Sequence, residues 1–239
     1  MRERQIISSI NDSQLFLKNL NILREFSFPS LLKPNKLKYK INSIESPKYE
    51  ELFLFSLENQ YYNIILNDYS YFQFDFDEEE DRKNRYIYPS ARYAFYPNPF
   101  ENINDDIGAI QQLYDEGEID FEEYSQAMSE AKPLGKKIPV RYDLSFKQYR
   151  EIYHPVSHFH FGMAENSRIP TDKLFTPLLF TKFIVNMYYM QELENIDDGT
   201  FPLHNEFKSK INSCKKINEY NNERVKYISH LEEEILAIK

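Results

Sequence analysis

Hydrophobic residues in the first 24 positions recur at a helical spacing. Between residues 3 and 24 their spacing is roughly helical, with an interruption by three polar residues at 11–13. The apolar positions are Ile6, Ile7, Ile10, Leu15, Leu17, Leu20 and Leu23. This period is that of one face of a helix, so it predicts one or two short amphipathic helices. Pro29 and Pro34 predict a loop after them.

The pattern changes to alternation between residues 62 and 76. Two apolar runs, 62–66 and 71–76, flank the turn-forming pair Asn67-Asp68, and in the second run Phe alternates with polar residues. Alternation with a period of two is typical of a half-buried strand, and the turn between the runs predicts a β-hairpin. We expect the acidic run 77–81 to form a solvated hairpin tip, and 92–96 to form a further strand.

A helical period returns between residues 105 and 131. The apolar residues form two stripes that are separated at Gly117, and Asp120 stands three residues before Glu123. This last spacing is that of a capping box at the start of a helix. We therefore predict an αα-hairpin over 105–131, inserted between strands, and interpret it as packing scaffold rather than as an oligomerisation module.

The rest of the chain predicts two more strands and further helices. Residues 139–143 and 158–161 have strand character, and Thr176-Pro177 joins a good N-cap to a residue suited to the first helical position. The helix that begins there is expected to run to about Glu194 and, being apolar nearly all round, to lie buried at the centre. Residues 205–239 predict a C-terminal helical tail on the surface or bound to a partner. We expect a single α+β domain over 1–239, with a mainly antiparallel sheet packed against the buried helix.

Composition narrows the classes of function. The net charge of −9 disfavours broad non-specific DNA binding, which relies on a basic field, but it leaves room for a local basic site or a basic protein partner. The single Cys214 rules out an internal disulfide, and the first residues contain no apolar signal segment, so we expect a cytoplasmic protein. The longest apolar stretch, 178–190, is too short and too interrupted to cross a membrane, so no membrane partner is expected.

The candidate chemistry lies in the segment 141–168. Three of the five histidines occur there within seven residues. They are His154, His158 and His160. Residues two apart on a strand share a face, so His158 and His160 project together, and Arg141 and Asp143 do the same one strand earlier. If the two strands are neighbours, one open sheet surface carries all four side chains.

The first interpretation of this cluster is acid–base catalysis on a phosphodiester. His158 and His160 would be the acid and the base, and Asp143 would orient one imidazole. The phosphate would be held by residues that donate hydrogen bonds or carry positive charge: Arg141, Arg168 and His154. Such a site needs no cofactor, because RNA can supply its own 2′-hydroxyl as the nucleophile.

Two other interpretations stay open. His158 and His160 form a His-x-His pair that can bind a divalent metal such as zinc, with His154 or Asp143 as a further ligand. Alternatively, the histidines are partly buried polar residues that hydrogen-bond the backbone or a carboxylate and stabilise a corner of the sheet.

Four short motifs carry a resemblance to a known family. They are Arg141-Tyr-Asp143, His154-Pro-x-Ser-His158-x-His160-x-Gly162, Arg168-Ile-Pro170, and Thr176-Pro177 followed by an aromatic-rich helix. Together they resemble the bacterial family catalogued as domain of unknown function 2290, over most of the chain. The resemblance implies a site in this region and no particular chemistry. The Arg-aromatic-Asp motif with clustered histidines is also similar to small ribonuclease-like toxins, and families of this kind often stand in phage-defence loci.

We therefore expect a toxin-like or phage-defence-associated bacterial protein that acts on RNA or a nucleotide phosphate as a metal-independent ribonuclease or other phosphodiesterase. The rival expectation is a non-enzymatic partner or regulatory subunit of a defence complex, which would bind its partner through residues 205–239. A metal-dependent enzyme with a His-x-His site is the third.

Overall fold

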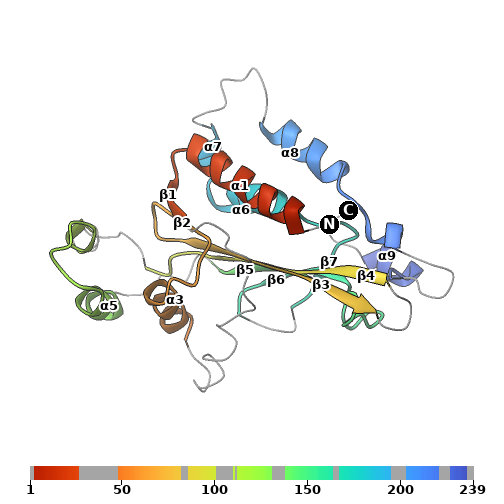
Figure 1. Ribbon diagram of the computed structural model, residues 1–239, viewed down its shortest axis with the longest axis horizontal. Helices are drawn as coiled ribbons and strands as arrows, with labels where there is room; N and C mark the ends of the chain where they lie inside the picture. The colour runs from red at the N-terminus through yellow and green to blue at the C-terminus, as the bar shows by residue number, and fades with distance from the viewer. Residues whose placement is uncertain are drawn as a thin grey trace.

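An antiparallel sheet with helices on both of its faces forms the centre of the molecule (Figure 1). The structure is a computed structural model of the 239-residue chain. It describes residues 3–26, 48–81, 86–100, 110, 112–130, 138–163, 167–194, 203–220 and 227–235. The predicted α+β class with a mainly antiparallel sheet is confirmed.

The sheet of the described chain has seven strands that follow one another in sequence and in space. They are β1 (Leu23–Phe26), β2 (Ile64–Leu66), β3 (Tyr71–Asp81), β4 (Tyr86–Tyr96), β5 (Val140–Leu144), β6 (Ser157–Phe161) and β7 (Ile169–Pro170). Each strand pairs antiparallel with the next, in the order β1 to β7. The predicted hairpin and the predicted strands at 92–96, 139–143 and 158–161 are confirmed.

One face of this sheet is apolar, because side chains alternate between the two faces along each strand. In β3, Phe72 and Phe74 point into the main core, while Gln73 and Asp75 point to the opposite face. The same alternation holds in the strands that follow. The core side chains there are Tyr93, Phe95, Val140, Tyr142, Leu144 and Phe159.

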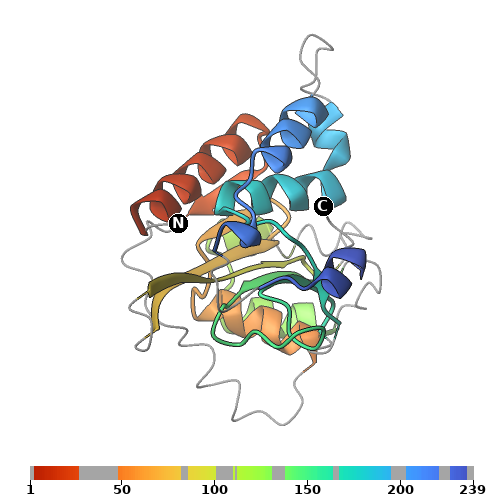
Figure 2. The same cartoon turned by 90° about the vertical axis from the view of Figure 1, so that its right-hand side faces the viewer.

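Four helices lie over the apolar face (Figures 1 and 2). They are α1 (Glu3–Asn19), α6 (Pro177–Tyr188), α7 (Met190–Glu194) and α8 (Leu203–Asn212). The first helical segment is one helix of 17 residues rather than two. Thr176 caps α6, since its hydroxyl accepts the N–H of Leu179 at 3.3 Å. The predicted central helix is thus confirmed up to Tyr188, but the chain leaves the helix at Tyr189, with φ of −132°, and resumes as α7.

The opposite face is apolar only at its β1–β3 end. There α3 (Tyr49–Glu58) and α5 (Phe121–Glu130) enclose a second cluster, which includes Phe53, Tyr71 and Tyr124. Figure 1 shows these two helices on the far side of the sheet from α1 and α6. The β4–β6 end of this face carries polar side chains instead.

The predicted helical hairpin is confirmed where the structure describes it. Residues 112–115 are helical, the chain turns at Gly117 with φ of +74°, and α5 follows, all between β4 and β5. The capping box is present: the N–H of Asp120 donates to Glu123 Oε2 at 3.0 Å, and the N–H of Glu123 donates to Asp120 Oδ1 at 2.9 Å. Residues 105–109, 111 and 131 of the predicted hairpin lie outside the described residues.

The C-terminal tail contributes to the core. It contains α8, the short 3-10 helix η1 (Ile217–Tyr220) and α9 (His230–Ile235). Ile217 and Tyr227 are buried in the main core, and Glu232 is buried beside it. Part of the apolar pattern that predicted a partner-binding tail therefore serves packing within the chain, while binding of a partner by 205–239 stays a prediction.

Two further expectations have a different outcome. The acidic run 77–81 is not a hairpin tip: β3 continues through Asp81, which pairs with Tyr86, because the long alternating pattern of β3 and β4 carries the ladder past the acidic residues. The predicted loop with Pro29 and Pro34 lies outside the described residues. Every helix in the described part of the chain is too short or too polar to cross a membrane.

Candidate metal centre

The polar face carries two rows of side chains that run across β4, β5 and β6. In one row Arg92 stands opposite Asp143, which stands opposite His158; in the next, Arg141 stands opposite His160. Directly opposed residues have Cβ atoms about 5 Å apart, so the register alone brings these five side chains together. The condition left open by the sequence is met: the strands of Asp143 and His158 are neighbours, and their polar side chains share one face.

Asp143 is the centre of this cluster. Arg92 Nε lies 3.1 Å from Asp143 Oδ1, and Arg141 Nε and Nη2 each lie 3.1 Å from Oδ2. Burial opposes the charge of the carboxylate, but the contact with His160 and the charges of Arg92 and Arg141 outweigh it and hold the pKa of Asp143 well below its usual range. The carboxylate is therefore ionised and fixed at both oxygens.

The two histidines are buried and direct ring nitrogens at this carboxylate. His158 is 0% and His160 is 2% exposed. His160 Nε2 lies 3.4 Å and His158 Nε2 4.0 Å from Asp143 Oδ2. Among the described residues, neither Nε2 atom has a hydrogen-bond partner of acceptable geometry. Buried polar atoms without partners are rare in folded proteins, and an ion or a water is a common reason for them.

The second ring nitrogen of His158 fixes its tautomer. Nδ1 lies 2.8 Å from the carbonyl oxygen of Pro155, which only accepts, so Nδ1 carries the hydrogen and Nε2 presents a lone pair. Burial, with the nearby His160 and His154, lowers the pKa of His158 to about 3 against the opposing effect of Asp143. His158 is therefore a neutral imidazole at neutral pH. A neutral imidazole whose other N–H donates to a backbone carbonyl is typical of a metal ligand.

The donor atoms are close enough together to form a candidate metal site. One oxygen of Asp143 and one nitrogen each of His158 and His160 all lie within 4.8 Å of one another. Two ligands on one zinc-like ion, each about 2 Å from it, are on the order of 3–4 Å apart. The Asp143–His160 separation of 3.4 Å lies within that range and the Asp143–His158 separation of 4.0 Å at its upper limit, so the donor atoms would have to move closer together to share one ion. Two histidines and a carboxylate are a ligand set that divalent transition metals accept with coordination positions left open.

Access to the cluster is from the Asp143 side. We expected both imidazoles to face an open surface, but the structure buries them: the ring of His158 packs edge to face against those of His154 and His160. Asp143 is 14% exposed and, with Arg92, lines a cavity of about 210 Å³. A small polar group can approach the carboxylate and Arg92 through this cavity.

The model of the family named Uncharacterized conserved protein (DUF2290) matches residues 20–239. The chain belongs to the DUF2290 family. Comparisons with curated proteins and with solved structures found no match. The motif resemblance in the sequence is thereby confirmed, and the chemistry of this DUF2290 protein has to be argued from its own side chains.

The other predicted phosphate-binding residues lie beside the cluster. The ring of His154 meets that of His158 edge to face, with centroids 5.0 Å apart. Burial and the positive charge of Arg168 lower the pKa of His154. Neither His154 nor Arg168 contacts Asp143 in the described part of this DUF2290 chain. His154 instead contacts His158, so it lies behind the candidate ligands rather than at the carboxylate.

Arg92 is the member of the site that sequence reasoning missed. It lies in the strand predicted at 92–96, about 50 positions before Asp143, and only the β4–β5 register brings it to the carboxylate. An Arg at the polar position of an otherwise aromatic strand was the available signal. Cys214 is no competing nucleophile, because burial raises the pKa of its thiol to about 11.

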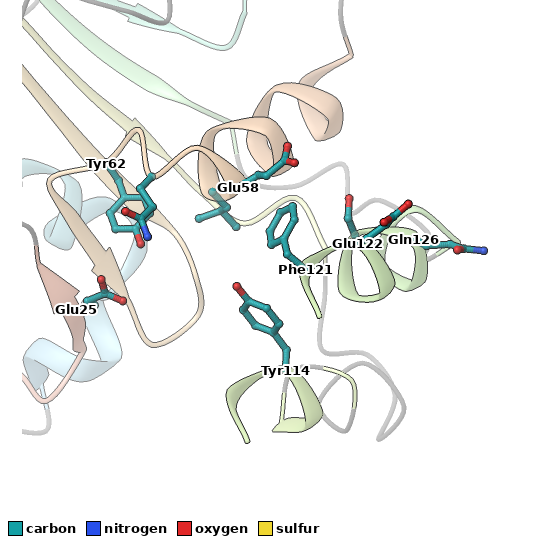
Figure 3. Close-up of a pocket in the computed structure, with 10 residues that line it drawn as sticks. Glu25, Glu58, Tyr62, Tyr114, Phe121, Glu122 and Gln126 are labelled. Carbon is teal, nitrogen blue, oxygen red and sulfur yellow. The ribbon is translucent and has the colours of Figure 1, made fainter. Parts of the chain in front are cut away.

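A larger cavity lies at the other end of the same face. It has a volume of about 780 Å³ between α3, α5 and β1, and its lining includes Glu25, Glu58, Glu122, Tyr62 and Tyr114. Figure 3 shows Tyr62 and Glu25 on one side of this cavity, with Tyr114 and Phe121 across from them. No histidine in the described part of the chain lines it, so it is separate from the cluster of Asp143, His158 and His160.

Proposed function

We propose that this DUF2290 protein is a metal-dependent enzyme that hydrolyses phosphate esters of RNA or nucleotides, with the metal bound by Asp143, His158 and His160. The proposal is carried by one observation: two buried imidazole Nε2 atoms without hydrogen-bond partners are directed at one ionised carboxylate. We include a toxin-like or phage-defence role in the proposal, and its support is the sequence similarity to small ribonuclease-like toxins alone.

Metal binding explains the histidines better than acid–base catalysis does. A general acid must be in its protonated form near neutral pH, whereas His158, with a pKa lowered to about 3, is a neutral imidazole there. The pair would also have to meet the substrate, and both rings are buried. A purely structural role requires buried water to pair these nitrogens, since each one left unpaired costs roughly 1–3 kcal/mol.

The surrounding charges favour an anionic substrate. A divalent cation with Arg92 and Arg141 would exceed Asp143 and the cavity-lining Asp75 and Asp77 by one positive charge, which an anion such as a phosphate would offset. Arg92 and Arg141 are partly exposed beside Asp143, and the planar guanidinium is suited to phosphate oxygens. The cavity at Arg92 is small, so we expect a terminal or flexible phosphate rather than duplex nucleic acid to enter it.

Asp143, His158 and His160 would hold the metal, which would supply the chemistry for hydrolysis by lowering the pKa of a water that attacks phosphorus. The bond from phosphorus to the leaving ester oxygen would break, and that oxygen would take up a proton from solvent. Arg92 and Arg141 would offset the charge that develops on the phosphate oxygens.

The test combines metal analysis with cleavage. Untagged protein is analysed for bound metals and incubated with total RNA and with nucleoside mono-, di- and triphosphates, with and without a chelator. We expect bound metal and chelator-sensitive cleavage. Both should be lost in Asp143→Asn and in the double variant His158→Ala with His160→Ala, whereas Glu194→Gln, at an exposed position on α7, keeps them.

The alternatives give different results in the same experiment. Cleavage that persists in chelator and in metal-free protein would support acid–base chemistry instead. A folded protein that binds no metal and leaves every RNA and nucleotide intact would contradict both enzymatic hypotheses.

A second candidate function, binding of a basic partner, is favoured by the cavity of Figure 3. Three carboxylates and three aromatic rings line it, and no lysine or arginine of the described chain does. Aromatic faces and carboxylates both attract guanidinium groups.

Calorimetry with a short peptide tests this second function. A Gly-Arg-Gly-Arg-Gly peptide, acetylated and amidated, should bind more tightly than the same peptide with citrulline in place of arginine. The double variant Glu58→Gln with Glu122→Gln should weaken binding of the arginine peptide. The control double variant, Glu151→Gln with Glu194→Gln, should leave binding unchanged. Equal binding by the wild type and both double variants would count against a basic partner at this cavity.

A further inference from the structure

The loop that orients His158 runs from Arg150 to Pro155. A two-bond bridge closes it: the N–H of Arg150 donates to His154 O at 3.0 Å, and the N–H of His154 donates to Arg150 O at 2.7 Å. The loop ends at Pro155, whose carbonyl accepts from His158 Nδ1. The conformation of this loop therefore sets the direction in which His158 presents Nε2.

The loop contains a strained residue. Ile152 has φ of +68°, in the left-handed region that a β-branched side chain strongly disfavours. Burial does not explain this conformation, because the Ile152 side chain is 45% exposed. A strained backbone of this kind persists only where its surroundings hold it, and such positions cluster at functional sites.

Glu232, from the distant C-terminal helix α9, holds the strained residue in place. The Glu232 side chain is 3% exposed, and its Oε1 accepts the N–H of Ile152 at 2.9 Å. Its Oε2 accepts the hydroxyl of Tyr149 at 2.9 Å and the N–H of Ser229 at 2.8 Å. A buried carboxylate with three donors is a rigid anchor, since each bond to it is charge-assisted.

We infer that Glu232 is a positioning residue of the metal centre. It acts through the Ile152 N–H on the 150–155 loop, through the loop on the Pro155 carbonyl, and through that carbonyl on the ring of His158. The inference rests on the proposed metal site and makes the end of the chain a part of that site. It also gives the C-terminal segment a role that needs no external partner.

Cobalt(II) titration of the chelator-treated full-length protein tests this inference, because the visible absorption of cobalt reports the geometry of its ligands. Glu232→Gln keeps the size of the side chain but replaces the carboxylate with an amide that has a single acceptor oxygen. We expect cobalt affinity to fall about 10–100-fold, the range for loss of a group that orients a metal ligand, and the absorption band to change shape. Glu234→Gln, an exposed neighbour on the same helix, should leave both unchanged.

Two further variants separate positioning from general stability. Tyr149→Phe removes one bond to Glu232 and keeps the bond to Ile152, so it should lower the melting temperature without changing the cobalt spectrum. Ile152→Gly removes the backbone strain, so in the Glu232→Gln background it should recover a substantial part of the lost affinity. Equal cobalt binding and spectra for Glu232→Gln and Glu234→Gln would overturn the inference.

Hydrogen exchange on the wild-type chain covers the case in which Glu232→Gln does not fold. If the loop and the metal site are coupled, metal binding must stabilise the loop, so the Ile152 amide should exchange more slowly with cobalt bound than without it. An unchanged rate in metal-loaded protein refutes the coupling. A wild-type protein that binds no cobalt refutes the metal site itself, which is a distinct result.

Discussion

Side chains alternate between the two faces of the sheet, and burial has opposite energetic consequences on the two faces: it stabilises the apolar face and costs free energy on the polar face at β4–β6. On the apolar face, side chains such as Phe72, Tyr142 and Phe159 pack against α1 and α6, and each contributes roughly 1.5–3 kcal/mol by leaving water. On the polar face at β4–β6, Asp143, His158 and His160 are buried at a cost, because charged and polar groups lose their hydration.

That cost is only partly offset. Asp143 is paired by two arginines, but the buried nitrogens directed at it from His158 and His160 have no partner among the described residues. At the β1–β3 end of the same face the chain builds an apolar cluster instead, so the polar cluster is a local feature and not a property of the whole face. Single buried atoms without partners also occur on the apolar face, such as Tyr93 Oη and Thr181 Oγ1, but here four ring nitrogens of His154, His158 and His160 lie together without partners among the described residues. Such a concentration of unpaired atoms points to a requirement other than stability at this place.

The largest loss of stability is expected from a substitution on the apolar face. Phe159→Ala removes a fully buried ring that packs against Tyr142, Phe175 and Phe183. Its free energy of unfolding should fall by about 3–5 kcal/mol, through lost burial and the cavity left behind. Urea denaturation followed by circular dichroism measures this loss. A loss below about 1 kcal/mol would show that burial of the apolar side of β6 contributes little to stability. The proposed energetic difference between the two faces would then be wrong.

The fold of the apolar face was predictable from the sequence, because its signal is periodic. Alternating phenylalanines specify β3, and Thr176-Pro177 specifies the start of α6, each within a few neighbouring residues. The end of α6 at Tyr189 was not predictable from the same pattern, since apolar residues continue past it. The acidic residues of β3 were misassigned because local charge indicated a turn, whereas pairing with β4 decides the strand.

The polar site was predictable only in part. Spacing by two on adjacent strands was sufficient to place Asp143 with His158 and His160. The sequence could not supply the β4 register that adds Arg92, nor the burial of the rings, because both depend on how distant segments pack. The same limit hid Glu232, which is 80 positions from the backbone N–H that it binds.

A smaller effect is expected from pH, and it arises only on the polar face. Burial, with His160 and His154 nearby, lowers the pKa of His158 in the folded state to about 3, below its unfolded value of about 6.5. Between these values the unfolded chain binds a proton that the folded chain does not, so stability is full above pH 6.5 and falls as the pH decreases. For metal-free protein we expect a loss of about 2 kcal/mol from pH 7 to pH 5.

The control for this pH dependence is His158→Phe, which should show a smaller loss over the same interval. The loss that remains in this variant is expected from His154, whose pKa burial and Arg168 also lower. Asp143 does not interfere there. Its folded pKa is also lowered, so its contribution is lost only below its unfolded value of about 4. Urea midpoints at pH 7 and pH 5 give the comparison, and equal losses in both proteins would show that His158 is not the titrating group.

Substitution of His160 is expected to change stability least and metal binding most. His160→Leu replaces a buried ring, whose nitrogens lack partners, by an apolar side chain of similar volume. In metal-free protein the free energy of unfolding should stay within about 1 kcal/mol of the wild type, since the lost contact with Asp143 is set against the removal of unpaired buried nitrogens. Zinc or cobalt binding, measured by calorimetry, should disappear. A loss of stability above about 2 kcal/mol, with no metal bound by the wild type, would instead make His160 a structural residue and remove the difference between the two faces.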